Sequence, residues 1–186
     1  MQQEIIKRPG FTVFLTGLPA SGKSSLAQVL CARLREIEHR AVTILDGDEL
    51  RRSVCADLGF SKQDRDTNVR RVGSLAAEIT RRGEVAICAL IAPYESTRKE
   101  VQASIERWGG FLLVHLSTPI GVCEDRDIRG LYARARANLI ENFTGVSDPY
   151  ERPQDAAVSL DASVLSPAQG VDKIIRLLIE RKYIEC

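Results

Sequence analysis

The stretch FLTGLPASGKSS contains the residue types and the spacing with which proteins hold phosphate groups. Its pattern G-x-x-x-x-G-K-[ST] is matched by Gly17, Gly22, Lys23 and Ser24. In this pattern the glycines let backbone N–H groups point inward, the lysine reaches the β- and γ-phosphates, and the serine can ligate Mg²⁺. An apolar run precedes the motif and a helical pattern follows it, a context that favours a phosphate cradle over a chance glycine turn. The motif predicts a site for a nucleoside triphosphate with Mg²⁺.

Two aspartates in DGDELR provide carboxylates directly after a second apolar run. Open α/β folds keep their ligands at the carboxyl ends of the strands, so these side chains are placed where a ligand is expected. Asp46 could orient Mg²⁺ through water, with Ser24 as a direct ligand, and Asp48 could accept the proton of an acceptor hydroxyl. A plain Asp-Gly turn without a chemical role is the alternative.

A group of arginines follows these aspartates, namely Arg51, Arg65, Arg70 and Arg71. Arg65 and Asn68 are three residues apart and fall on one helical face. Planar guanidinium groups suit phosphate or sulfate oxygens, so the arginines predict an anionic acceptor. The alternative is a solvated helix face whose arginines pair with neighbouring acidic residues.

The segment 124–153 is charged, rich in arginine and interrupted by glycines and prolines. These features predict a mobile insert that closes as a lid over the transferring phosphates. The arginines expected to act on the phosphates are Arg126, Arg129, Arg134 and Arg136. Phe60 and Phe143 lie in polar stretches with glycines, and each is either a loosely packed core residue or a face on which a base stacks.

Three classes of protein share this phosphate loop: small-molecule kinases, GTPase switches and ATPase motors. The chain has no Asn-Lys-x-Asp guanine-reading motif after a strand, and its 186 residues with one cradle leave no room for a sensor domain. The remaining class, a small-molecule kinase, needs a second pocket for the acceptor and a means of excluding water.

The elements that must position these residues alternate between short apolar runs and helical patterns. This alternation predicts an α/β fold with a parallel sheet flanked by helices, in a single domain over 1–186. The predicted strands are 11–17, 41–48, 84–94, 111–119 and 156–163, and the predicted helices are 22–37, 64–83 and 166–183. In the first two helices the expected buried stripes are Leu26, Val29, Leu30, Leu34, Ile37 and then Val69, Val72, Leu75, Ala76, Ile79.

The overall composition excludes some partners. Basic and acidic side chains number 26 and 25, so nothing points to nucleic acid or to an anionic membrane surface. The N-terminal stretch MQQEIIKRPGF lacks a long apolar segment, which predicts neither a signal peptide nor an anchor. Five cysteines without a CxxC pair predict reduced thiols and a cytoplasmic protein.

Several blocks of the sequence together resemble adenylylsulfate kinases: GLPASGKSS, DGDELR, GFSKQDRDTNVRR, IAPY, TPIGVCEDRDIRGLYARAR and NFTGVSDPYERP. The resemblance covers nearly the whole chain. It implies a P-loop kinase fold with a lid and transfer of the γ-phosphoryl group of ATP to the 3′-hydroxyl of adenosine 5′-phosphosulfate. It also implies a homodimer, and the N-terminal stretch KRPGFTVFLTG resembles the form in which such a kinase follows an ATP sulfurylase domain.

The expected catalytic residues are Lys23, Asp48 and Arg65. The expected nucleotide contacts are Gly17, Leu18, Pro19, Ala20, Ser21, Gly22, Lys23, Ser24, Ser25, Arg126 and Arg134. The expected acceptor contacts are Asp48, Arg51, Phe60, Arg65, Asn68, Ile91, Ala92, Arg129, Asn142 and Phe143. The resemblance implies that Phe60 and Phe143 clasp the acceptor adenine.

Three positions depart from the family pattern. Ala92 stands where the family has the serine of ISPY, Arg129 stands where lysine is usual, and Asn142 replaces a glycine. The intact phosphate loop and Asp48 favour an active kinase. The alternatives are a non-catalytic nucleotide-binding module that regulates an ATP sulfurylase, and a kinase for another small molecule such as a nucleoside or a sugar acid.

Overall fold

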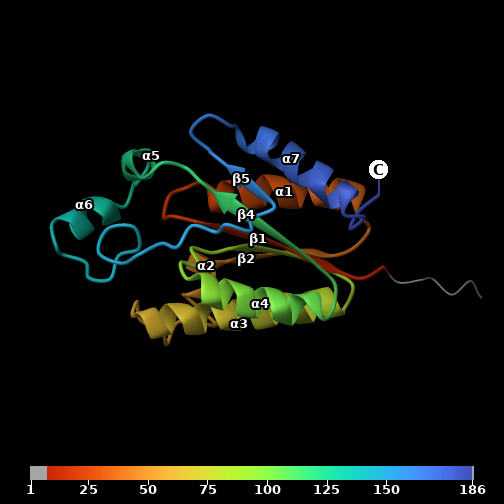
Figure 1. Cartoon of the computed structure of the whole chain (residues 1–186), viewed down its shortest axis with the longest axis horizontal. Helices are drawn as coiled ribbons and strands as arrows, with labels where there is room; N and C mark the ends of the chain where they lie inside the picture. The colour runs from red at the N-terminus through yellow and green to blue at the C-terminus, as the bar shows by residue number, and fades with distance from the viewer. Residues whose placement is uncertain (1–7, 186) are drawn as a thin grey trace, which may run out of the picture.

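The computed structural model describes residues 8–185. Five parallel strands form one sheet in the order β2-β3-β1-β4-β5, with helices on both faces (Figure 1). The strands are β1 Phe11–Gly17, β2 Val42–Asp46, β3 Val85–Ala89, β4 Gly110–Leu116 and β5 Val158–Leu160. The helices are α1 Lys23–Ile37, α2 Gly47–Leu50, α3 Lys62–Arg81, α4 Glu95–Glu106, α5 Ile120–Asp125, α6 Leu131–Arg136 and α7 Pro167–Glu180. The predicted parallel α/β sheet is confirmed.

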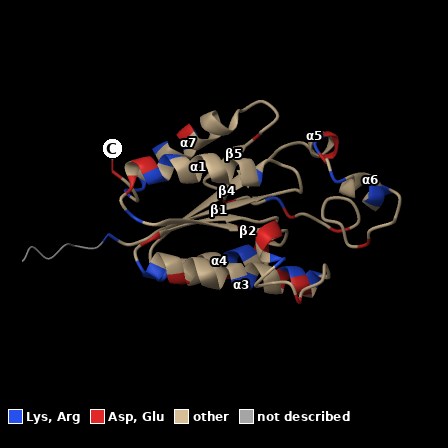
Figure 2. Ribbon diagram, turned by 180° about the vertical axis from the view of Figure 1, so that it is seen from behind, with Lys and Arg blue, Asp and Glu red and all other residues tan. Residues whose placement is uncertain are grey.

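The central strands are apolar along their whole length because helices cover both of their faces. Every residue of β1, β3 and β4 is buried. Figure 2 shows basic and acidic residues mixed over the helices, whereas the strands are almost entirely uncharged. Asp46, the last residue of β2, is the one Asp, Glu, Lys or Arg within the five strands.

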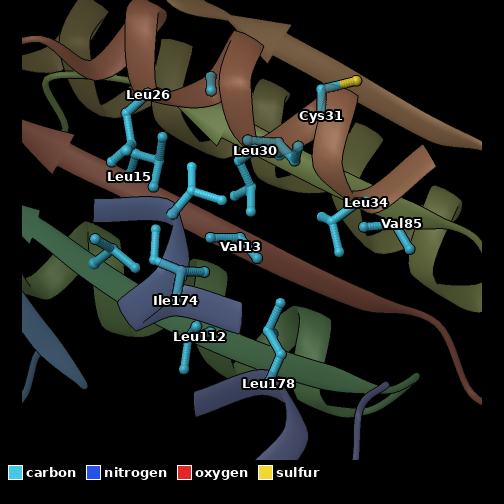
Figure 3. Packing of buried hydrophobic residues seen from close by; sticks show 14 of the residues in the cluster. Val13, Leu15, Leu26, Leu30, Cys31, Leu34, Val85, Leu112, Ile174 and Leu178 are labelled. Atoms are coloured by element: carbon cyan, nitrogen blue, oxygen red, sulfur yellow. The ribbon is translucent and has the colours of Figure 1, made fainter. Parts of the chain in front are cut away.

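One half of the core lies between the sheet and the helices α1 and α7 (Figure 3). Val13 and Leu15 of β1 point to this side, where they meet Leu30 of α1 and Ile174 of α7. The capping box at Ser166, which joins its hydroxyl to the amide of Gln169, starts α7 at the point where its apolar face reaches the sheet.

The other half of the core lies between the sheet and the helices α3 and α4. Phe14, which points away from Val13 and Leu15, packs here against Phe111 with their ring centroids 5.8 Å apart. Thr12 also faces this side, where its hydroxyl lies 2.8 Å from that of Thr80 in α3. The alternation along β1 therefore assigns successive side chains to the two halves of the core.

Helix α4 was not predicted from the sequence, and the strand predicted over 84–94 was too long. The strand β3 ends at Ala89, and the chain turns at Ala92, whose φ is 43°. Two polar residues, Thr97 and Arg98, lie on the buried face of α4 beside Val101 and Ile105. This helix lacks an apolar stripe because part of its buried face is polar.

Three residues of the expected helical stripes are more exposed than predicted. Val29 and Ile37 in α1 are 37% and 38% exposed, and Leu75 in α3 is 36% exposed. The buried face of α1 is instead centred on Leu30 and includes Ala27. The small Ala27 belongs to the face because α1 packs closely against the sheet there.

The segment 124–153 is only partly the loose insert that the sequence predicted. It contains α6, and together with α5 it projects from one end of the sheet (Figure 1). Tyr132, Ala135 and Phe143 of this segment form a small apolar cluster with Cys123 of α5. The segment predicted to be a lid is therefore a packed unit as well as a carrier of arginines.

Some expectations from the sequence fall outside the described residues. The stretch without a predicted leader lies largely within 1–7, and Cys186 is the last residue of the chain. The other four cysteines are free and buried. None of the helices within residues 8–185 combines the length and the apolar character that crossing a bilayer requires.

Two neighbouring residues of α1, one buried and one exposed, provide a matched stability test. Leu30→Ala removes a fully buried side chain and should lower the free energy of unfolding by about 2–5 kcal/mol, because the cavity does not close completely. Val29→Ala, one residue earlier and exposed, should change it by less than about 1 kcal/mol. Urea unfolding followed by circular dichroism measures both values. Equal losses in the two variants would contradict the packing of α1 described above.

Candidate nucleotide and acceptor site

The phosphate loop joins β1 to α1 and depends on two glycines. A side chain at Gly17 would place its Cβ 2.7 Å from the carbonyl oxygen of Leu116, which leaves no space for it. Gly22 has a φ of 100° and caps the N-terminus of α1, a conformation that side chains disfavour. The hydroxyl of Thr118, after β4, donates to the carbonyl of Ser21 at 2.9 Å and holds the loop from the other side.

Lys23 directs its ammonium group into this loop. Its Nζ donates to the carbonyl oxygens of Gly17 at 3.0 Å and Leu18 at 2.7 Å. Burial disfavours the charged form and lowers the pKa of Lys23 to about 8, an effect that the distant carboxylates Asp46 and Asp48 only partly oppose. An anion bound at the loop would stabilise the protonated ammonium and raise its pKa.

Ser24, Asp46 and Asp48 lie together at the mouth of the loop. The hydroxyl of Ser24 donates to Oδ2 of Asp46 at 2.6 Å, and Oδ1 of Asp46 accepts from the amide of Asp48 at 2.9 Å. Hydroxyl and carboxylate oxygens are the ligands that Mg²⁺ prefers, so the pair Ser24 and Asp46 suits this ion. Within residues 8–185 no group of three or more His, Cys, Asp or Glu side chains could hold a metal. Nucleotide phosphates and water would have to supply the other ligands.

A cavity of about 810 Å³ opens at the carboxyl edge of the sheet beside this loop. Most of the residues predicted to bind nucleotide, metal or acceptor line it. They are Pro19, Ala20, Ser21, Gly22, Lys23, Ser24, Ser25, Asp46, Asp48, Arg51, Phe60, Arg65, Asn68, Ile91, Ala92, Arg126, Arg129 and Phe143. Gly17, Leu18, Arg134 and Asn142 do not line it.

Two guanidinium groups meet around Phe60 at the end of the cavity away from the phosphate loop. The Cζ atoms of Arg51 and Arg65 lie 4.6 Å and 5.6 Å from the centroid of the Phe60 ring. Arg65 is 7% exposed, and burial lowers the pKa of both arginines. Asp148 contributes a carboxylate 3.7 Å from Nε of Arg65. Two partly desolvated cations side by side, of which only Arg65 lies within 4.0 Å of a carboxylate, favour an anionic ligand.

Two asparagines support this end of the cavity in different ways. Oδ1 of Asn68 is buried and has no hydrogen-bond partner among residues 8–185, so a donor group of a ligand would satisfy it. Asn142 adopts a φ of 54°, which asparagine tolerates better than most residues, and this explains how it replaces a glycine. Its backbone carbonyl accepts a hydrogen bond from the Arg65 guanidinium. Asn142 thus contacts a predicted acceptor residue although it does not line the cavity.

The lid arginines divide into two groups. Arg129 pairs with Asp48, with its NH2 2.5 Å from Oδ2, and Arg126 donates to the carbonyl of Ala162 at 2.6 Å. Both arginines are therefore at the cavity. Arg134 is exposed on α6 outside the lining, and Arg136 pairs with Glu124 at 2.7 Å. The contact of Arg134 with nucleotide stays a prediction.

Tyr132 is a contact between lid and phosphate loop that the sequence did not reveal. Its hydroxyl donates to the carbonyl of Pro19 at 3.0 Å, and its ring packs edge-on against Phe143 with centroids 5.0 Å apart. Phe143 is 9% exposed, so it is a core residue of the lid as well as part of the cavity wall. No pattern in LYARAR distinguishes Tyr132 from a surface residue.

The residues after β5 were also missed. Ala162, Leu165, Ser166, Pro167 and Gly170 line the cavity on the side of the phosphate loop. The rule that ligands bind beyond the carboxyl ends of parallel strands could have identified this segment, because it follows the fifth predicted strand.

A parallel sheet, a glycine loop that opens α1 and a lid over the same edge define a protein with the P-loop kinase fold. Residues 9–161 match the sequence model of the adenylylsulphate kinase family, and the chain belongs to that family.

Known relatives share this fold and much of the sequence. A "Probable adenylyl-sulfate kinase" of Synechocystis is 41% identical over 180 residues, which cover 97% of this chain and 99% of the relative. The structure of the Mycobacterium tuberculosis APS kinase CysC, in complex with AMPPNP and APS, superposes with a TM-score of 0.85. It is 38% identical, with 92% of this chain and 98% of the other covered.

A third relative is much longer than this chain. The "Sulfate adenylyltransferase" of Aspergillus oryzae is 47% identical over 169 residues, covering 91% of this chain and 30% of the relative. The chain spans less than a third of the length of the sulfate adenylyltransferases that it matches.

Nucleotide affinity should depend on the protonation of Lys23. The free protein holds this pKa at about 8, so at pH 9 about a tenth of the molecules carry the ammonium charge, and the dissociation constant of ATP should rise about tenfold between pH 7 and pH 9. Lys23→Arg keeps its charge over this range and should remove the dependence, even if its affinity is lower. Calorimetric titration of both proteins with ATP measures the effect. A flat profile for the unaltered protein would contradict the assignment of Lys23 to the phosphates.

Proposed function

We propose that this protein transfers the γ-phosphoryl group of ATP to the 3′-hydroxyl of adenosine 5′-phosphosulfate, giving 3′-phosphoadenosine 5′-phosphosulfate and ADP. The observation that carries the proposal is one continuous cavity with the phosphate loop at one end and Arg51, Phe60 and Arg65 at the other. The family of the chain and the APS complex of its M. tuberculosis relative support the choice of acceptor.

The acceptor end of the cavity suits a nucleotide that carries phosphate and sulfate. Arg51 and Arg65 would bind the anionic groups, and the carbonyl of Asn68 would accept from the adenine or ribose. The exposed ring of Phe60 would stack on the base, with Phe143 on the lid opposite. An uncharged nucleoside would leave the two guanidinium groups without their ligand.

Asp48 is proposed as the group that receives the proton of the acceptor. The 3′-oxygen forms a bond to the γ-phosphorus, the bond from that phosphorus to the β–γ bridging oxygen breaks, and the hydroxyl proton passes to the Asp48 carboxylate. In the free protein Arg129 occupies Oδ2 of Asp48. The acceptor hydroxyl therefore competes with Arg129, and the displaced guanidinium is free to turn toward the phosphates.

Lys23 would hold the β- and γ-phosphates, and Ser24 and Asp46 would hold Mg²⁺ with the nucleotide. When bound, the ion neutralises charge on the transferring phosphoryl group. The lid would exclude water, because Tyr132 ties it to the phosphate loop while Arg126 ties it to the loop after β5.

The domain organisation, the cellular location and the oligomeric state of the protein are also proposals. We propose a single kinase domain that acts as a cytoplasmic homodimer, with a lid at about 124–153. Association or fusion with an ATP sulfurylase is supported by the relatives named sulfate adenylyltransferase. Size-exclusion chromatography with light scattering would test the dimer.

The proposed reaction predicts dependence on the sulfated nucleotide. ADP release from ATP should be rapid with adenosine 5′-phosphosulfate and slow with adenosine or gluconate, since neither of these presents two anionic groups to the arginines. Asp48→Asn should reduce turnover by about 10²–10⁴-fold while ATP binding is retained, because a positioned base contributes that much. Equal turnover with the uncharged nucleoside would overturn the acceptor assignment. ATP binding without turnover of any acceptor would support the non-catalytic module instead.

The position of Ala92 predicts direct transfer without a phosphorylated protein intermediate. Ala92 lines the cavity with a methyl group, and in-line transfer needs positioning and charge stabilisation but no protein nucleophile. Ala92→Ser should change turnover by no more than about tenfold. Labelled ATP without acceptor should leave no phosphoprotein that forms at the rate of turnover. A kinetically competent phosphoprotein would contradict direct transfer, and an inactive natural protein rescued by Ala92→Ser would favour the non-catalytic module.

A further inference from the structure

We propose that Arg98, on α4 behind the acceptor end of the cavity, is a positioning residue that holds one wall of the acceptor pocket in register with a supporting segment. The wall is the turn at 91–93 after β3, which lines the cavity, and the supporting segment is 148–151 at the end of the lid, which places Asp148 beside Arg65. The identity of the acceptor in this proposal rests on the proposed function, whereas the attachment of the two segments by Arg98 rests on contacts within the protein.

Arg98 is a buried cation whose contacts are unusual. It is 3% exposed, and its guanidinium donates to the carbonyl of Ala92 at 2.7 Å and to the carbonyl of Glu151 at 2.8 Å. Among residues 8–185 it forms no salt bridge within 4.0 Å, and its Nε has no hydrogen-bond partner. A buried arginine held only by neutral carbonyls adds little stability, since its desolvation is costly. Its use is therefore geometric.

One terminal nitrogen of Arg98 holds a strained turn. Ala92 has a φ of 43°, a conformation that alanine rarely adopts, and both Ile91 and Ala92 line the cavity. The carbonyl of Ile91 accepts from the hydroxyl of Thr16 at 2.5 Å. Thr16 and Arg98 thus fix consecutive carbonyls of the turn, and this aims the two cavity residues at the acceptor.

The other terminal nitrogen of Arg98 fixes the segment 148–151 at the end of the lid. The amide of Glu151 donates to the carbonyl of Pro93 at 2.9 Å, and its carboxylate accepts from the amide of Glu95 at 2.6 Å. Three residues earlier, Asp148 accepts from the hydroxyl of Tyr94 at 3.3 Å and lies beside Arg65. A shift of this segment would move the carboxylate that orients the Arg65 guanidinium.

The planar fork of arginine explains why this residue type suits the position. Its two terminal nitrogens reach carbonyls on different segments at once, whereas a lysine carries a single nitrogen on its stem and a methionine carries no donor. Arg98 does not line the cavity, so it acts on the acceptor only through Ala92 and the 148–151 segment.

The test compares Arg98→Met and Arg98→Lys with a control, Arg81→Met, which removes an exposed arginine that pairs with Glu78 on α3. Steady-state kinetics give KM for adenosine 5′-phosphosulfate and for ATP, and hydrogen exchange measures the protection of the Glu151 amide.

In Arg98→Met the acceptor KM should rise by at least about tenfold, because small displacements in a reacting complex are costly. KM for ATP should stay within about threefold. Exchange at Glu151 should accelerate by at least about tenfold. Arg98→Lys should fall between Arg98→Met and the natural protein, and Arg81→Met should match the natural protein.

Several outcomes would overturn the proposal. These are an unchanged acceptor KM in Arg98→Met, equal rises in the two KM values with a lower melting temperature in both Arg98 variants, or unchanged exchange at Glu151. A natural protein that phosphorylates no sulfated nucleotide would refute the proposed function instead. In that case the exchange at Glu151 still decides whether Arg98 clamps the two segments.

Discussion

All five strands run in the same direction, and this constraint determines where every part of the site lies. Parallel strands deliver their carboxyl ends to one edge of the sheet, so loops far apart in sequence meet there. The phosphate loop follows β1, the aspartates end β2, the turn at Ala92 follows β3, Thr118 follows β4 and Ala162 follows β5. The helices on both faces bury the central strands. The cavity exists because the sheet assembles its walls.

Four of the cations at this edge share a mode of attachment. Lys23, Arg98 and Arg126 donate to backbone carbonyls, and Arg51 does so at the carbonyl of Gly59. A carbonyl holds the position of a cation without cancelling its charge. For the residues that line the cavity, the positive potential remains available to an anionic ligand. For Arg98, which lies behind the wall, the same mode of attachment couples two segments of backbone.

The lid combines a fixed end with contacts that can change. Its outgoing segment is held against the β3–α4 turn through Glu151, and a small apolar cluster around Tyr132 keeps its shape. Toward the phosphate loop it is held by the hydroxyl of Tyr132, and toward α2 by the pair between Arg129 and Asp48, two exposed side chains. An exposed ion pair of this kind stabilises by only about 0–1 kcal/mol, so a ligand can displace it easily. This difference between the two ends is what the proposed closure of the segment as a lid would require.

The sequence by itself determined the elements whose signals are local. The phosphate loop at a strand-to-helix junction, the parallel α/β sheet, and Asp46 and Asp48 after a strand all follow from short-range patterns, and the structure places them as expected. The resemblance of several blocks also indicated acceptor residues, most of which line the cavity with the loop, and their contact with an acceptor stays a prediction. The loop and the sheet could be predicted because neighbouring residues determine backbone conformation and hydrophobic period.

Only the tertiary structure decided which side chains form contacts between segments that are distant in the sequence. Arg98 reads as one more charged residue in ESTRKEVQASIE, and its role depends on carbonyls six and 53 residues away in the chain. Tyr132 reads as a surface residue of the lid until its contact with Pro19 is known. Val29 seemed to belong to a buried stripe, but the packing of α1 on the sheet is centred elsewhere. Which side chains make these contacts depends on the distances between packed elements. The hydrophobic period within one element carries no information about those distances.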